Sequence, residues 1–241
     1  MLVATLEDEL TVAGPDGHHL QRVRRLRPGE AVTAADGTGA WRPYEMVEAG
    51  RGRVVLRAAG PPVLEPVLAP PLRIACALTK GDGPESVVRQ ATELGVDAVL
   101  PVLAARSVAR WPEARRAQAL ARLRRVADEA AAQARRARRL VVEPLQPLAD
   151  LAGRPGLVLA DREGPPAAAL PDPGADGWLV VVGPEGGLDP AEREALGGPP
   201  RLAVGPHVLR AETAGSAVAA ALAGRRAPDP ATTERDGEPR F

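Results

Sequence analysis

The stretch WLVVVGPEGGLDPAEREAL, from Trp178 to Leu196, decides the fold of this chain. It begins with a β-branched apolar run at residues 180–182, which is typical of a strand buried on both faces. A glycine-rich loop, GPEGG, follows directly, and Asp189 and Pro190 then supply the N-cap and first-turn proline of a helix. Open α/β sheets bind ligands at loops of this kind. The sequence therefore predicts that the backbone of this loop holds a small molecule.

The residues of this loop restrict the ligand. They match neither GxGxxG nor the GK[ST] of a phosphate-binding loop. Glu185 within the loop would repel a pyrophosphate, so we expect a ligand with a cationic or neutral face, such as an adenosine that carries a sulfonium. On these residues alone, an ordinary strand-to-helix turn is the alternative. A second segment, LAVGPHVLRAETAGSAVAAAL from Leu202 to Leu222, again predicts a strand, a tight loop and a helix.

The rest of the chain divides into two regions. Residues 1–65 contain short β-like segments between turn signals and predict a small all-β domain, with one short helix at His18–Arg27. After a proline-rich stretch, expected strands at 73–78, 98–103, 140–142 and 157–160 alternate with expected helices at 83–95 and 112–139. This alternation predicts a mostly parallel sheet with helices on both faces. The expected boundaries are an N-terminal domain at 1–65, an extended linker at 66–72, an α/β domain at 73–224 and a disordered tail at 225–241.

Charge is distributed unevenly. The net charge is zero, which argues against a general nucleic-acid coat, yet residues 104–140 hold eleven arginines and three acids. A second arginine cluster lies at residues 22–27. Localised arginine patches on a neutral chain favour a site that grips phosphate, although a solvated helix face is the alternative. The lone Cys76 in IACAL predicts a buried thiol. Neither a signal peptide nor a membrane-length apolar run is found, so we expect a cytoplasmic protein.

Several segments, in order along the chain, resemble one enzyme family. They are HHLQRVRRLRPGEAV (18–32), ALTKGDGPESVVRQATELGVDAVLPV (77–102), ARSVAR (105–110), DEAAAQARR (128–136), GPEGGL (183–188) and VLRAETA (208–214). Together they resemble the SPOUT class of RNA methyltransferases, and more narrowly the family that methylates N3 of a uridine in 16S ribosomal RNA. The chain departs from the family pattern at Ala132 and Ala134, where Glu and Ser are usual. It also lacks a proline near Leu140 and begins without the family's usual Arg and Phe.

The resemblance implies a fold and a set of partners. The fold is a C-terminal SPOUT α/β domain with a deep trefoil knot, joined to a small N-terminal PUA-like β-barrel domain. The implied cofactor is S-adenosylmethionine, and the implied partner is 16S ribosomal RNA or the small ribosomal subunit. A homodimer is implied, with each cofactor site completed near the subunit interface. Neither a membrane nor a metal is expected as a partner.

Methyl transfer to uridine N3 directs attention to two residues. N3 of a neutral uridine holds a proton, and a nearby arginine would favour the anionic base through charge-assisted hydrogen bonds to the base carbonyls. Arg210, at a loop–helix junction, is the candidate for this catalytic role. The alternative is an ion pair of Arg210 with Glu212 or Glu185 that braces the loop. Glu212 is a second catalytic candidate, either as the proton acceptor or as a brace.

The remaining expected contacts involve the cofactor and the RNA. Cofactor contacts are expected at Ala160, Gly183, Pro184, Glu185, Gly186, Gly187, Leu188, Val204, Gly205, Val208, Leu209 and Thr213. RNA contacts are expected at His19, Arg22, Arg24, Arg25, Lys80, Arg106, Gln133 and Arg136. Two rival hypotheses remain: a SPOUT enzyme with another base or a ribose hydroxyl as its target, and a non-catalytic RNA-binding protein. Cofactor binding separates the enzymes from the binding protein.

Overall fold

The computed structural model describes residues 1–18, 20–21, 26–50 and 52–233. The chain forms two compact units. The first contains Met1–Val67 together with residues 135–138 and the segment from Ala231 onward. The second contains Leu68–Ala134 and Arg139–Pro230. The expected division of the chain into a domain at 1–65, a linker at 66–72 and a domain at 73–224 stays a prediction.

The first unit is built on an antiparallel sheet, in agreement with the all-β prediction. Its strands are β1 (Glu9–Val12), β2 (Ala31–Ala35), β3 (Ala40–Gly50) and β4 (Arg53–Ala58), in the order β1-β4-β3-β2, and the short β5 (Val63–Leu64) pairs with β3. Tyr44, Met46 and Leu56 are fully buried in its core. The described helix α1 covers Gly14–His18, and most of the helix expected at His18–Arg27 lies outside the described residues.

The second unit contains the parallel sheet that the βα alternation predicts. Its strands are β7 (Leu72–Ala77), β8 (Ala98–Leu103), β9 (Val141–Val142), β10 (Gln146–Pro147), β11 (Leu157–Ala160), β12 (Trp178–Val182) and β13 (Arg201–Leu202). They are ordered β10-β8-β7-β12-β11-β13, and β9 also pairs with β8. The strand pairs of this sheet are parallel. All five residues of β12 are buried, as the apolar run at 180–182 predicts for a central strand.

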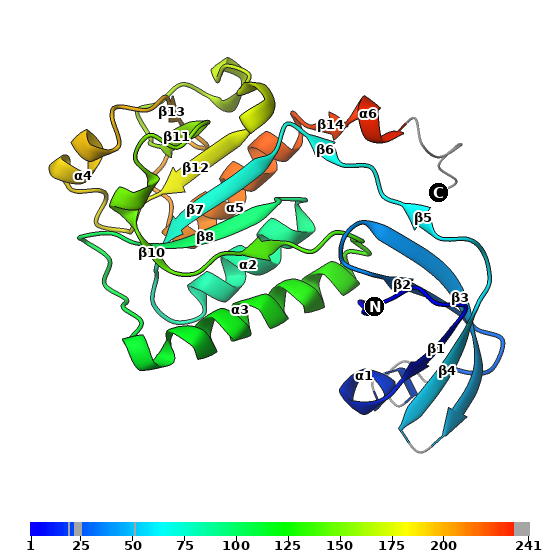
Figure 1. Ribbon diagram of the computed structural model, residues 1–241. Helices are drawn as coiled ribbons and strands as arrows, with labels where there is room; N and C mark the ends of the chain where they lie inside the picture. Colours follow the sequence, from blue (N-terminus) through cyan, green and yellow to red (C-terminus); the bar gives the residue numbers. More distant parts are fainter. Residues whose placement is uncertain (19, 22–25, 51, 234–241) are drawn as a thin grey trace. The chain divides into compact units, whose positions relative to one another are not determined.

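Helices cover both faces of this sheet. Val180 and Val182 share a core with α2 (Gly83–Glu93), α3 (Glu113–Gln133) and α5 (Ala211–Ala223), which lie on one face (Figure 1). Leu179 and Val181 point to the opposite core, which includes Leu148, Leu151 and Leu196 near the 3-10 turn at 148–151 and helix α4 (Pro190–Ala195). The expected helix at 112–139 is shorter, because Arg135 adopts a left-handed φ of 56° that no α-helix continues.

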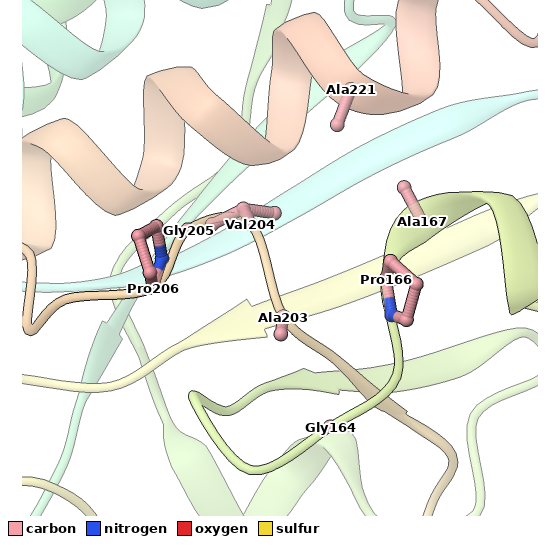
Figure 2. A pocket seen from close by; sticks show the side chains of 8 residues that line it. All are labelled: Gly164, Pro166, Ala167, Ala203, Val204, Gly205, Pro206 and Ala221. Carbon is pink, nitrogen blue, oxygen red and sulfur yellow. The ribbon is translucent and has the colours of Figure 1, made fainter.

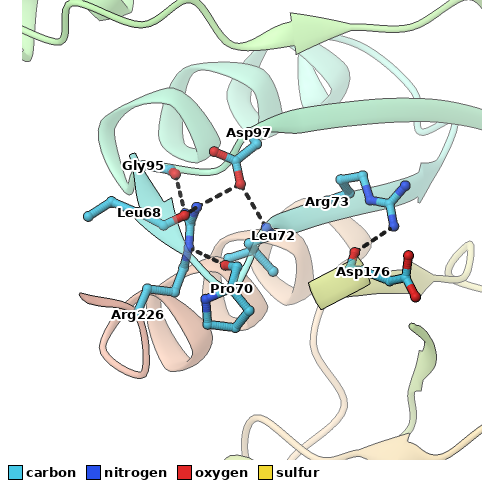
Figure 3. A network of polar contacts seen from close by, with 8 residues as sticks. All are labelled: Leu68, Pro70, Leu72, Arg73, Gly95, Asp97, Asp176 and Arg226. Carbon is cyan, nitrogen blue, oxygen red and sulfur yellow. Dashed lines mark hydrogen bonds and ion pairs between the residues drawn. The ribbon is translucent and has the colours of Figure 1, made fainter. Parts of the chain in front are cut away.

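The chain after α5 is ordered up to Thr233, so the prediction of disorder from Arg225 is wrong for these residues. Strand β14 (Ala227–Pro228) pairs with β6 (Leu68–Ala69), and α6 covers Pro230–Thr233. Figure 3 shows the cause: the Arg226 guanidinium, fully buried, lies 2.6 Å from Asp97 and donates to the Pro70 carbonyl at 2.8 Å. A buried, paired arginine holds a polar segment that composition alone assigns to a tail.

The deep trefoil knot expected for the second unit stays a prediction. No helix in the described part of the chain combines the length and the apolar character that crossing a membrane requires.

Candidate functional site

The strand register brings three predicted cofactor segments to one edge of the sheet. Leu159 on β11 pairs with Val181 on β12, and Ala160 pairs with Leu202 on β13. The three strands therefore end at nearly the same level. Their following loops begin at Asp161, Gly183 and Ala203, all at the carboxyl edge of a parallel sheet, where α/β folds bind ligands.

The loop after β12, Gly183–Leu188, is called the GPEGGL loop here. It is a tight turn in which the Gly187 N–H donates to the Pro184 carbonyl at 2.8 Å. Gly187 has a φ of +70°, a conformation that favours glycine. Leu188 is buried against the sheet, whereas Glu185 and Gly186 are exposed. The loop thus has a fixed shape and presents its backbone outward.

Neighbouring residues brace the GPEGGL loop from two sides. Arg106 donates to the Gly186 carbonyl at 3.0 Å and lies 3.7 Å from the Asp189 carboxylate. Asp189 caps α4 by accepting from the Ala191 N–H at 2.9 Å, and the Asp189 N–H donates to the Glu192 carboxylate at 2.9 Å. The expected N-cap and first-turn proline of this helix are therefore confirmed. These contacts keep the loop in place without a ligand.

The loop after β13, Val204–Leu209, is called the second loop here. Its predecessor Ala203 donates to the Pro165 carbonyl at 2.8 Å. From Val204 to Leu209, the structure records no hydrogen bond to any described residue. Val208 is 77% exposed, and the helix α5 that follows has no side-chain cap at Arg210. Its backbone N–H and C=O groups are therefore available to a ligand.

A hollow with a volume of about 410 Å³ lies beside the second loop (Figure 2). The segment at 164–167 forms one wall, the segment at 203–206 forms the facing wall, and Ala221 of α5 points in from above. The lining side chains are small and apolar. Of the residues predicted to contact the cofactor, Val204 and Gly205 line this hollow. Those of the GPEGGL loop lie outside its lining, at the end of the adjoining strand.

The two catalytic candidates flank the start of α5. Arg210 is exposed, in extended backbone with φ −64° and ψ 153°. No carboxylate of a described residue lies within ion-pair distance of its guanidinium, so the structure does not show the bracing pair with Glu212 or Glu185. The Glu212 carboxylate faces Gly83 at the start of α2, at 3.9 Å from the place where a Cβ would stand. Thr213 is exposed in the same turn.

Two further polar groups lie near Glu212 at the end of β7. Burial, with the nearby charges of Glu212 and Glu185, raises the pKa of the Cys76 thiol to about 12. Cys76 therefore stays a thiol at neutral pH and is not a nucleophile; the prediction that it is buried is confirmed. The Thr79 hydroxyl is buried and has no partner among the described residues. Sequence reasoning missed Thr79, because an isolated threonine after a strand carries no signal.

Asp161, the first residue after β11, anchors the third segment. Its carboxylate lies 2.8 Å from Arg193 of α4. The hydrogen bond from Arg193, followed by one from the Glu163 N–H, holds the Asp161 pKa below its usual value despite partial burial. This pair connects the segment after β11 to the helix after β12.

The expected RNA contacts are dispersed. Lys80 and Arg106 are exposed at the carboxyl ends of neighbouring strands β7 and β8, and Arg106 is engaged with the GPEGGL loop. Gln133 is exposed at the end of α3. Since α3 connects two parallel strands, Gln133 lies toward the amino edge. Arg136 belongs to the first unit, and His19, Arg22, Arg24 and Arg25 lie outside the described residues.

Two family comparisons cover most of the chain. Residues 67–223 match a family described as an RNA methyltransferase domain. Residues 12–58 match a family described as an RNA methyltransferase PUA domain. The first match includes all three loops of the carboxyl edge, and the second includes strands β2, β3 and β4.

Comparisons with individual proteins agree with these matches. The chain is 37% identical to the ribosomal RNA small subunit methyltransferase E of Mycobacterium tuberculosis, over 91% of this chain and 89% of the relative. It is 28% identical to the protein of the same name from Bacillus subtilis, over 85% of each. The structure of the Neisseria gonorrhoeae protein of that name, bound to S-adenosylmethionine, has a TM-score of 0.80 at 24% identity and covers 92% of this chain and 95% of that one.

Proposed function

This chain belongs to the ribosomal RNA small subunit methyltransferase E family, and from that premise we propose that it transfers a methyl group from S-adenosylmethionine to N3 of a uridine in 16S ribosomal RNA. The family resemblance and the fold class expected from the sequence, a PUA-like domain followed by a parallel α/β domain similar to SPOUT structures, are confirmed. The modified atom and the roles of individual residues are the proposal.

One observation supports the proposal most strongly. A braced glycine loop and a second loop without hydrogen bonds to described residues leave the same sheet edge, and both lie within the matched methyltransferase region. A catalytically silent RNA-binding protein has no need of a loop whose backbone groups are left unpaired beside a hollow. The arrangement therefore favours an enzyme that binds a small cofactor.

The residues at this edge fit S-adenosylmethionine. The hollow beside Val204 and Gly205 is about 410 Å³ and is lined by apolar atoms, as an adenine ring requires. Free backbone groups of the second loop satisfy the polar edge of the ring. Glu185 and Glu212 both lie close enough to Cys76 to affect its pKa, so negative charge is available near a cationic sulfur.

Chemistry at the acceptor needs alignment and control of one proton. When bound, S-adenosylmethionine would supply a methyl group activated on a positively charged sulfur, with a neutral thioether as the leaving group. Arg210, which makes no ion pair with a described residue, lies at the end of the second loop and stabilises the anionic uracil by donating to its carbonyl oxygens. The N3 proton passes to the Glu212 carboxylate or to water.

Binding of the RNA requires more than this edge. Lys80 is an exposed cation three residues after the end of β7, and a lysine there is suited to a phosphate near the reacting base. We further propose a homodimer in which the partner completes the site, in line with the family resemblance. Sedimentation analysis tests the dimer: a monomer at micromolar concentration would contradict it.

The decisive experiment uses small ribosomal subunits and naked 16S ribosomal RNA from a strain that lacks this protein. Purified enzyme and S-adenosylmethionine labelled in the methyl group are added, and the modified nucleotide is identified by mass spectrometry. We expect N3-methyluridine at a single position. Methyl on a ribose or on another base would replace the proposal with a different target. Cofactor binding without any transfer to either substrate would contradict a 16S ribosomal RNA substrate.

A further inference from the structure

Arg225 lies four residues after Ala221, the α5 residue that points into the hollow, in the turn that follows the end of the helix. Its guanidinium donates to the Ala167 carbonyl at 2.7 Å and to the Leu170 carbonyl at 2.8 Å, and it lies 2.7 Å from the Asp172 carboxylate. The same group lies over the Trp178 ring, 4.9 Å from the ring centroid. One side chain therefore fixes three points of the segment at 167–172.

That segment continues the wall of the hollow. Pro166 and Ala167 form the wall that faces the second loop (Figure 2). Gly164 packs closely against strand β13, because a Cβ at this position would stand 2.7 Å from the Leu202 nitrogen. The amino-terminal end of the wall is thus held by the sheet, through the Pro166–Ala203 bridge. Its carboxyl-terminal end is held by Arg225.

We propose that Arg225 is a positioning residue for the cofactor: it sets the wall at 164–172 at the distance from the second loop that the adenine ring of S-adenosylmethionine requires. The inference rests on the proposed function, because it takes the hollow as the adenine site. A planar fork that satisfies three acceptors at once is specific to arginine, since a lysine ammonium reaches them only as a point charge.

The neighbouring Arg226 supplies a matched control. It is also bound to main-chain carbonyls and to a carboxylate, but its partners are Leu68, Pro70, Gly95 and Asp97, none of which lines the hollow (Figure 3). Loss of Arg226 is expected to weaken the fold without selectively changing the cofactor site. Loss of Arg225 is expected to change the cofactor site.

The test compares Arg225→Met, Arg225→Lys and Arg226→Met with the wild type. Calorimetry measures affinity for S-adenosylmethionine and for 5′-methylthioadenosine, which lacks the amino-acid part, and steady-state assays separate KM from kcat. For Arg225→Met we expect both affinities to fall by about tenfold, equivalent to about 1.4 kcal/mol. The KM for the cofactor rises in parallel, and kcat at saturating cofactor stays within about threefold of the wild type. Arg225→Lys gives a smaller loss in the same direction.

The outcomes separate this inference from the proposed function. Wild-type affinities in both folded Arg225 variants would overturn the inference and leave the proposed function intact. A loss for S-adenosylmethionine without a loss for methylthioadenosine would also overturn it, because the effect would then lie at the amino-acid end. Equal losses in Arg226→Met would assign the effect to general stability and overturn it too. If the wild type binds neither compound, both proposals fail. Should Arg225→Met not fold, Arg225→Lys decides alone.

Discussion

The two loops at the carboxyl edge each contain a Gly-Pro pair, but they differ in their hydrogen bonding. The GPEGGL loop has an internal hydrogen bond, a bound arginine and a capped helix directly after it. The second loop, Val204–Leu209, has none of these among the described residues, and it ends at a helix without a side-chain cap. Contacts within the protein therefore hold the conformation of the GPEGGL loop. We expect a bound ligand to supply the corresponding contacts for the second loop.

From this difference we infer different roles in ligand binding: the GPEGGL loop positions the ligand, and the second loop encloses it. A loop that already holds its bound conformation costs little entropy when a ligand arrives, and it sets the position of the ligand. A loop with unpaired backbone groups orders on binding and encloses the ligand. Arg210 follows the second loop directly, so closure of that loop also positions the proposed catalytic group. Five substitutions test this division of roles, and they are taken from the largest expected effect to the smallest.

The largest effect is expected at the end of the second loop. Arg210→Ala should lower the methylation rate on the order of 10²-fold, because a preorganised charged donor to the developing anion is lost. Affinity for the cofactor and the melting temperature should stay nearly unchanged, since the Arg210 side chain is exposed and makes no ion pair with a described residue. Raising the pH should partly restore the rate by deprotonating N3 directly. Single-turnover rates across pH would exclude the catalytic role if the variant matches the wild type.

The next effect concerns the backbone of the second loop. A Cβ on Gly205 would meet only the Leu209 side chain, at an ordinary 3.8 Å. Gly205→Val should therefore fold normally yet lose about tenfold in affinity for S-adenosylmethionine, or about 1.4 kcal/mol, because it blocks close approach of the ligand. Calorimetry and a melting curve measure the two effects.

Gly183→Val is the matched variant in the GPEGGL loop. Its Cβ would stand 3.2 Å from Leu188, so overpacking should lower its unfolding free energy by about 1–3 kcal/mol. A Gly205→Val variant that is unstable, or a Gly183→Val variant as stable as the wild type, would reverse the comparison between the loops.

A smaller effect is expected where α4 begins. Asp189→Ala removes the N-cap of α4 and the carboxylate beside Arg106. The cap is worth about 1 kcal/mol of stability, and the partly exposed pair with Arg106 adds little. Urea unfolding should show this loss, with cofactor affinity reduced less than in Gly205→Val. An affinity loss larger than that of Gly205→Val would mean that bracing matters more than closure.

The smallest effect is a pH dependence at the third segment. The Asp161 pKa is lowered in the fold, chiefly by the hydrogen bond from Arg193. The ionised carboxylate therefore stabilises the fold above its unfolded pKa of about 3.9, and this contribution is lost as the pH falls from there through the folded pKa. Asp161→Asn should be less stable than the wild type at pH 7, and the gap should narrow at pH 3. A difference in unfolding free energy that does not change with pH would show that ionisation of Asp161 does not stabilise the fold.

The sequence predicted the elements around these loops well, because their signals are local. The β-branched run of β12 and the cap at Asp189 each depend on a few adjacent residues, and the structure confirms both. What the sequence could not predict depends on distant partners. Arg106 donates to the Gly186 carbonyl, eighty positions away, and the RNA contact expected of Arg106 stays a prediction.

The C-terminal arginines show the same limit more strongly. Composition assigned Arg225 and Arg226 to a disordered tail, because polar, proline-rich segments usually lack a core to pack on. Their partners lie 53 to 158 positions earlier in the chain. A local sequence pattern cannot predict contacts over such distances along the chain. The cofactor and RNA residues proposed from the family resemblance stay predictions until a ligand is bound.

Hydrogen–deuterium exchange with and without S-adenosylmethionine measures directly whether the second loop closes on the cofactor. We expect the amides of Val204, Gly205 and residues 207–209 to exchange quickly in the free protein and to slow strongly at saturating cofactor. The internally bonded Gly187 amide should already be protected and change little. If calorimetry shows the cofactor bound while exchange at 204–209 is unaltered, the second loop does not close on the ligand, and the division of roles between the two loops is contradicted.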